Sequence, residues 1–271
     1  MWTSGESMVI RTRGVSLEGR GYGPTPERAP TIVLLHEGLG CVELWRDFPQ
    51  KLAEATGYGV FAYSRQGYGR SDAALLPRPL DYMTREAVDV LPDVLKAIGF
   101  KKGVLAGHSD GASIAAIYAG SVQDHRVRGL VLMAPHFFTE PIGLDAIRDA
   151  RQAYDEGDLR ARLGRYHRDV DNAFRGWNDA WLDPTFEAWN IEEVIAYIRV
   201  PVLAIQGVDD QYGTRAQIAA LETQSYNPVD VAMLEDCRHS PHIDQPARTL
   251  AAVAEFVGRL DAIEAAEAEA A

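Results

Sequence analysis

The sequence predicts an α/β protein with a mostly parallel, eight-stranded, doubly wound sheet that helices cover on both faces. Short apolar, β-branched runs alternate with segments of helical periodicity along most of its 271 residues. This alternation is typical of right-handed β-α-β units, in which a helix connects one parallel strand to the next. A single long stretch, residues 136–199, shows no strand pattern and interrupts the alternation.

The elements of the N-terminal half follow in order. Residues 8–23 alternate weakly between apolar and polar and contain turn glycines, which favours a hairpin. The run TIVLLH, residues 31–36, is continuously apolar, as a strand buried on both faces would be. Helical spacing over residues 44–55 precedes a strand over 58–64, and a further helix is predicted over 83–99.

The C-terminal half continues the same rhythm. A strand over residues 103–107 leads directly into a helix of small residues over 111–121. Three further β-branched runs predict strands over 127–135, 200–207 and 229–236. With the hairpin and the two earlier strands, these runs complete the predicted sheet.

Residues 136–199 are too long for a structureless connection inside a compact domain. They are rich in charged and aromatic side chains. We therefore predict a helical insertion that forms a cap on a core domain of residues 1–135 and 200–271.

Composition excludes several classes of function. The net charge is -12, with 39 acidic and 27 basic residues, which works against binding to the phosphates of nucleic acid and to an anionic membrane. No apolar run reaches the length of a membrane span, and the N-terminus has no apolar signal segment. The two cysteines, Cys41 and Cys237, are far apart and lack metal-ligand spacing. These features predict a cytoplasmic protein, a monomer or homodimer, whose partner is a small molecule.

The segment GHSDG, residues 107–111, places Ser109 between the strand and the helix of small residues. A side chain at the apex of such a sharp turn projects clear of the backbone, and the flanking glycines relieve the crowding. The following helix directs its N-terminal N–H groups to the space beside the hydroxyl, where they would stabilise a developing anion. The pattern predicts that Ser109 is a nucleophile.

A serine hydroxyl needs a base that takes its proton and an acid that orients the base. The loop after the strand over 200–207 offers Asp209 and Asp210, and the loop after the last strand offers His239 and His242. The order serine, aspartate, histidine is the one expected for a parallel sheet with a nucleophile at this turn.

These motifs together resemble the α/β-hydrolase superfamily, in its capped branch with a serine nucleophile. The resemblance covers nearly the whole chain and rests on five segments in the order of the family. They are LLHEGLG, YSRQGYGRSD, GHSDG, GVDD and RHSPHIDQP.

The resemblance implies a role for each candidate. It favours Asp210 over Asp209 as the acid. Asp209 is then expected to cap the next turn. It favours His239 as the base, because Asp244, Gln245 and Pro246 follow at the expected distance. His242 is then expected at the start of the terminal helix or in the pocket wall.

The oxyanion hole is expected to use the backbone N–H of Asp110, the residue after the nucleophile. Gly38 supplies the second N–H by position, with Leu39 as the alternative. Glu37 stands where the family more often has a glycine. His36, at the end of its strand, is expected to brace this loop through hydrogen bonds.

Aromatic residues of the insertion predict an apolar pocket. Trp177 and Trp181, together with Leu39 and His136, are the candidate substrate contacts, although each tryptophan also fits simple packing of the cap. His125 and His167 lie in polar surroundings and are expected at the surface. None of the seven histidines forms an H-x-x-x-H or H-E-x-x-H pair, so no metal site is expected.

The expected function is a cofactor-independent serine hydrolase that cleaves a small to medium apolar ester or lactone. A hydrolase of carbon–carbon bonds in β-diketone-like compounds would use the same triad. A ligand receptor on the same fold is the alternative from another class. The resemblance disfavours an epoxide hydrolase or haloalkane dehalogenase, since those enzymes carry an aspartate where Ser109 stands.

Overall fold

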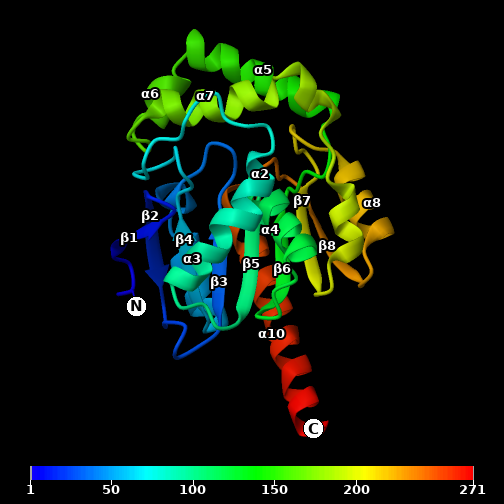
Figure 1. Ribbon diagram of the computed structural model, residues 1–271. Helices are drawn as coiled ribbons and strands as arrows, with labels where there is room; N and C mark the ends of the chain where they lie inside the picture. The colour runs from blue at the N-terminus through cyan, green and yellow to red at the C-terminus, as the bar shows by residue number, and fades with distance from the viewer. Residues whose placement is uncertain (1, 271) are drawn as a thin grey trace.

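A computed structural model describes residues 2–270 and contains one sheet of eight strands. The strand order is β1-β2-β4-β3-β5-β6-β7-β8 (Figure 1). β1 and β2 are antiparallel to their neighbours, and the other strands run parallel to one another, which confirms the predicted sheet. The strands are β1 Ser7–Thr12, β2 Val15–Tyr22, β3 Thr31–Leu35, β4 Gly59–Tyr63, β5 Gly103–His108, β6 Val127–Met133, β7 Val202–Gly207 and β8 Val229–Leu234.

Helices cover both faces of the sheet (Figure 1). Side chains alternate between the faces along β3: Val33 and Leu35 pack in the core under α2, α3, α4 and α8, whereas Ile32 and Leu34 pack in the core under α1 and α10. This double burial explains the continuous apolar run of that strand. The helices are α1 Phe48–Thr56, α2 Tyr82–Arg85, α3 Leu91–Ala97, α4 Asp110–Ser121, α8 Arg215–Gln224, α9 Pro241–Asp244 and α10 Pro246–Ala270.

The segment between β6 and β7 consists of helices joined by loops, with one isolated bridge between Phe138 and Asn190. It contains α5 Pro141–Asp155, α6 Leu159–Leu163, α7 Val170–Trp181 and the 3₁₀ helices η3 Pro184–Ala188 and η4 Glu192–Tyr197. Helices α5, α6 and α7 lie beyond the carboxyl ends of the parallel strands (Figure 1). The last part of the segment instead packs against α4, where a Cβ on Gly120 would lie 2.5 Å from the Val194 carbonyl.

Three further features refine the sequence-based expectations. The helix predicted over residues 83–99 contains a π-helical turn, Glu86–Val90, just before Pro92, which has no N–H for a regular helical hydrogen bond. Cys41 and Cys237 are buried free thiols. Within residues 2–270, no helix has the length and apolar character needed to cross a membrane.

The packing of Gly111 on β3 generates a prediction for stability. A Cβ at Gly111 would lie 2.0 Å from the Leu35 carbonyl oxygen, which is backbone and has no room to move. We expect Gly111→Ala to lower the free energy of unfolding by roughly 3 kcal/mol or more, measured by urea denaturation.

Gly258→Ala is the matched control, because Gly258 is exposed on α10 and nothing lies within 4 Å of its added Cβ. Alanine is the better helix former by up to about 1 kcal/mol, so this variant is expected to equal or exceed the wild type in stability. Equal losses in both variants would contradict the packing argument.

Candidate active site

Ser109 lies at a strained turn between β5 and α4. Its backbone has φ 53° and ψ −119°, a region that residues with a side chain rarely occupy. The turn is tight because a Cβ on Gly107 would lie 2.1 Å from the Gly111 carbonyl. The structure therefore has the strand-turn-helix geometry that the GHSDG segment predicts.

Asp210 and His239 form a buried hydrogen-bonded pair. They follow β7 and β8, and the Nδ1 atom of His239 lies 2.8 Å and 3.0 Å from the two carboxylate oxygens of Asp210. Burial opposes ionisation of Asp210. The charge and hydrogen bond of His239 and the N–H of Tyr212, 2.8 Å away, outweigh it and hold the Asp210 pKa below its usual value.

The alternative residues lie elsewhere. Asp209 is exposed, and its N–H donates to the carbonyl of Cys237. His242 lies in α9, packed against Trp45 and Phe48 with ring centroids 4.7 Å and 5.6 Å apart. The geometry thus pairs the preferred acid with the preferred base.

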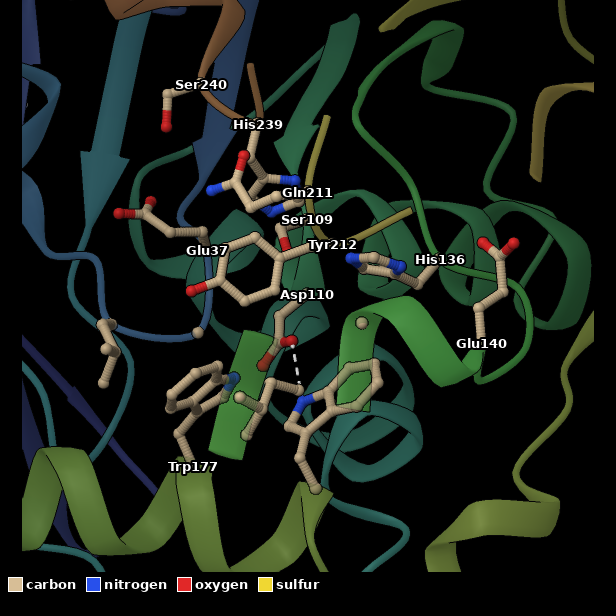
Figure 2. A pocket seen from close by; sticks show the side chains of 15 residues that line it. Glu37, Ser109, Asp110, His136, Glu140, Trp177, Gln211, Tyr212, His239 and Ser240 are labelled. Atoms are coloured by element: carbon tan, nitrogen blue, oxygen red, sulfur yellow. Dashed lines mark hydrogen bonds between the residues drawn. The ribbon is translucent and has the colours of Figure 1, made fainter. Parts of the chain in front are cut away.

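Ser109 and His239 line the same cavity (Figure 2). Within residues 2–270, the Ser109 hydroxyl and the His239 ring share no hydrogen bond. Because Nδ1 of His239 faces Asp210, Nε2 is the ring nitrogen left for a proton from serine. Hydrogen bonds between catalytic groups are often long in ligand-free enzymes and shorten when the substrate binds.

Three backbone N–H groups beside the serine have no hydrogen-bond acceptor in the part of the chain that the structure describes. They belong to Gly38, Leu39 and Asp110, and all three residues line the cavity. Asp110 is also the first residue of α4, so its N–H lies at the positive end of the helix dipole. The arrangement can bind an oxyanion, and the choice between Gly38 and Leu39 stays open.

The side chain of Asp110 has a different role from its N–H. Its carboxylate is completely buried and accepts a hydrogen bond from the Tyr82 hydroxyl at 2.6 Å. It also accepts one from Trp181 Nε1 at 3.2 Å, the dashed line at Asp110 in Figure 2. Arg65 Nη1 lies 3.6 Å away as the counter-charge. Asp110 therefore links the turn at Ser109 to α2 and α7.

Arg65 also anchors the loop after β3. Its Nη2 donates to the carbonyl of Glu37 at 2.9 Å, and its backbone N–H donates to His36 Nε2 at 3.0 Å. Burial first, and then the Arg65 charge, hold the pKa of His36 well below its usual value. A neutral His36 braces this loop, as expected from its position.

The cavity has a volume of about 180 Å³. The four candidate substrate contacts, Leu39, His136, Trp177 and Trp181, all line it. The Trp177 indole covers Gly38 so closely that a Cβ added to Gly38 would lie 2.1 Å from Trp177 Nε1. The lining residues are Glu37, Gly38, Leu39, Ser109, Asp110, His136, Glu140, Gly143, Ile147, Trp177, Trp181, Gln211, Tyr212, His239 and Ser240.

His136 contributes a neutral ring to the wall. Its centroid lies 5.5 Å from the rings of both Trp181 and His239. Burial lowers the pKa of His136 to about 3, and the neighbouring His239 adds to the effect. His136 therefore offers polarity without charge at neutral pH.

The expectation that His167 lies at the surface is wrong. The side chain is buried: Gly69 N–H donates to Nδ1, and Nε2 lies 3.0 Å from the carbonyl of Leu39. His167 thereby connects the helical segment to the loop after β3. His125 is exposed, as predicted.

Several lining residues were not identified from the sequence. Gln211 and Tyr212 directly follow the acid Asp210, and that proximity was a usable signal. Gly143 and Ile147 lie on α5 and carried no signal, because the way α5 lies over the sheet depends on tertiary packing. The other residues missed are Glu37, Glu140 and Ser240. No group of His, Cys, Asp or Glu in residues 2–270 could hold a metal ion.

Comparison with known proteins identifies the family of this chain. The model of a family described as "Alpha/beta hydrolase family" matches residues 32–253. The human protein named Serine hydrolase BPHL is 31% identical over 218 residues, which cover 77% of this chain and 72% of that protein. Epoxide hydrolase B of Mycobacterium tuberculosis (strain ATCC 25618 / H37Rv) is 26% identical over 227 residues, 82% of this chain and 60% of that protein.

Epoxide hydrolase 3 of Xenopus tropicalis is 29% identical over 133 residues, 49% of this chain and 35% of that protein, so this chain spans less than two thirds of both epoxide hydrolases. Among solved structures, the enol-lactonase of Burkholderia xenovorans LB400 has a TM-score of 0.73 at 20% identity. The alignment covers 93% of this chain and 100% of that one. The family match and the similarity of fold lead to one conclusion: the chain belongs to the alpha/beta hydrolase family.

Proposed function

We propose that this protein is a cofactor-independent serine hydrolase that cleaves a small to medium apolar ester or lactone. The observation that carries the proposal is the buried hydrogen-bonded pair of Asp210 and His239, because His239 lines one cavity with a serine on a strained turn. A serine, a base and an orienting acid drawn from three separate loops are the parts that acyl transfer needs.

In the proposed reaction the Ser109 Oγ attacks the substrate carbonyl carbon while His239 Nε2 takes the hydroxyl proton. Asp210 holds the ring and stabilises the imidazolium that forms. The N–H groups of Asp110 and Gly38 bind the tetrahedral oxyanion. Collapse of the tetrahedral intermediate breaks the bond between the acyl carbon and the leaving oxygen, and His239 returns the proton to the leaving alkoxide. Water then attacks the acyl-enzyme with His239 again as base, which releases the acid and restores Ser109.

The walls of the cavity support an apolar substrate. Trp177, Trp181, Leu39 and Ile147 supply aromatic and aliphatic surface, and the small volume favours a compact acyl group. We also propose that residues 136–199 act as a cap, because α5 and α7 carry Ile147 and both tryptophans. Ser109 stands at the position where the resemblance places an aspartate in epoxide hydrolases, which favours an acyl-transfer reaction over epoxide opening.

Replacement of the nucleophile tests the chemistry. We expect Ser109→Ala to lower turnover of p-nitrophenyl acetate at least roughly 10⁴-fold and to abolish labelling by a fluorophosphonate probe, because the proposed acyl-enzyme forms on the Ser109 hydroxyl. Ser121→Ala, at the exposed end of the same helix, is the matched control and should retain both signals. Labelling that persists in Ser109→Ala, or wild-type protein that reacts with neither reagent, would refute the proposal.

The two neighbouring aspartates provide a second test. We expect Asp210→Asn to reduce kcat roughly 10³- to 10⁴-fold, because an amide cannot hold His239 in the tautomer that leaves Nε2 free. Asp209→Asn makes the same change one residue away at an exposed site and is expected to leave kcat within about twofold of wild type. A loss confined to Asp209→Asn would transfer the role to that residue.

A further inference from the structure

Glu37 and His108 occupy the two positions immediately before the proposed reacting groups. Glu37 precedes Gly38 in the loop after β3, and His108 precedes Ser109 at the end of β5. Neither side chain has a role in the proposed reaction. Glu37 also stands where the resemblance expects a glycine, so its side chain needs a separate explanation.

His108 is buried between two acceptors. Its Nε2 lies 2.7 Å from the backbone carbonyl of His239, and its Nδ1 lies 3.4 Å from Glu37 Oε2. A neutral imidazole carries one N–H and would leave a lone pair facing one of these oxygens. The imidazolium form donates an N–H to the carbonyl and places its positive charge beside the carboxylate, so this surrounding favours a charged ring.

The charges around His108 agree with this assignment. Burial opposes protonation of His108, but the nearby Glu37 carboxylate and the carbonyl of His239 outweigh it and raise the His108 pKa. The Glu37 side chain is 27% exposed, and its partial burial opposes ionisation, yet His108 lowers the pKa of that carboxyl well below its usual range. The other titratable groups that face the ring are Asp210, which favours the charge, His239, whose ring centroid lies 5.1 Å away, and His242, whose own pKa burial lowers to about 3.

The Glu37 carboxylate has a fitted position. A Cβ on Gly40 would lie 2.3 Å from Glu37 Oε2, so the carboxylate occupies the space that a larger residue at position 40 would fill. The N–H of Gly40 donates to the Glu37 carbonyl at 3.1 Å and closes the turn. Figure 2 shows Glu37 on the segment beside those that carry Ser109 and His239.

We propose that the Glu37–His108 ion pair is a positioning element that holds the oxyanion loop, the serine turn and the His239 loop in register. The contacts run from Glu37 through the His108 ring to the His239 carbonyl, and so connect the oxyanion loop, the serine turn and the His239 loop, three of the four loops that carry the proposed reaction. The inference rests on the proposed function. It accounts for the glutamate in place of glycine, because glycine could supply no counter-charge for a buried imidazolium.

Glu37→Gln tests the ion pair by removing the charge and keeping the shape. Small misplacement of reacting groups costs up to roughly 10²-fold in rate, so we expect kcat to fall about ten- to a hundredfold with KM within about threefold of wild type. Without the carboxylate the imidazolium loses its counter-charge. The alkaline limb of the kcat/KM profile should therefore move to lower pH. Glu43→Gln, whose carboxylate faces Arg70, is the matched control and should leave both kcat and the limb unchanged.

NMR of the histidine ring nitrogens gives a readout that does not depend on turnover. The His108 signals, assigned by their loss in His108→Gln, should show an imidazolium at neutral pH in wild type and a neutral ring in Glu37→Gln. The inference is overturned if His108 titrates identically in the two proteins, or if Glu37→Gln keeps wild-type kcat and the same pH profile. Fluorophosphonate labelling of Ser109 in wild type separates this outcome from failure of the proposed hydrolase activity.

If Glu37→Gln does not fold, His108→Gln tests the same ion pair. The melting temperature of His108→Gln shows whether that variant is folded. The amide keeps a donor for the His239 carbonyl but removes the titrating charge. We expect a reduced kcat and a kcat/KM profile from which the alkaline limb has disappeared. An alkaline limb unchanged from wild type would overturn the inference, because the ring that titrates there would then be another one.

Discussion

The backbone of Ser109 can remain at a positive φ only because the chain is packed around it without spare volume. The Cα of Gly107 packs directly against the carbonyl of Gly111, and that of Gly111 packs directly against the carbonyl of Leu35 in the neighbouring strand, so neither position has room for a Cβ. Relaxation of the turn would need β3, β5 and α4 to separate, so core packing maintains the strain. The same contact directs the serine and the first N–H of α4 into one cavity.

Much of the sheet and the proposed triad follows from local patterns. The apolar runs on β3 and β5 are continuous because both faces are buried, and GHSDG combines a strand end, two glycines and a helix start. The loops after β7 and β8 offered Asp209, Asp210, His239 and His242 because parallel strands bring their carboxyl ends to one edge. The family resemblance then favoured Asp210 and His239. Trp177 and Trp181 were identified as contacts, whereas Phe174 packs inside the helical segment, stacked on Tyr154 at 3.7 Å.

The remaining parts depend on tertiary packing that leaves no short-range pattern. Ile147 reaches the cavity because of how α5 lies over the sheet, which depends on many weak contacts. His167 has polar neighbours in sequence but is buried in space, since Gly69 and Leu39 come to it from distant loops. The π turn at Glu86 places its carboxylate against the Tyr63 hydroxyl at 2.7 Å, a partner that lies in another element.

The bond from Trp181 to Asp110 has a bearing on how molecules enter. Trp181 is part of α7, and its buried indole N–H is shared between Asp110 and the Tyr82 hydroxyl. To lift α7 away from the sheet would strip a donor from a buried carboxylate, at a cost on the order of 1–3 kcal/mol. This hydrogen bond thus connects α7 directly to Asp110, the residue that follows Ser109. A ligand that displaces α7 from the sheet would break this hydrogen bond and, through Asp110, also disturb the turn at Ser109.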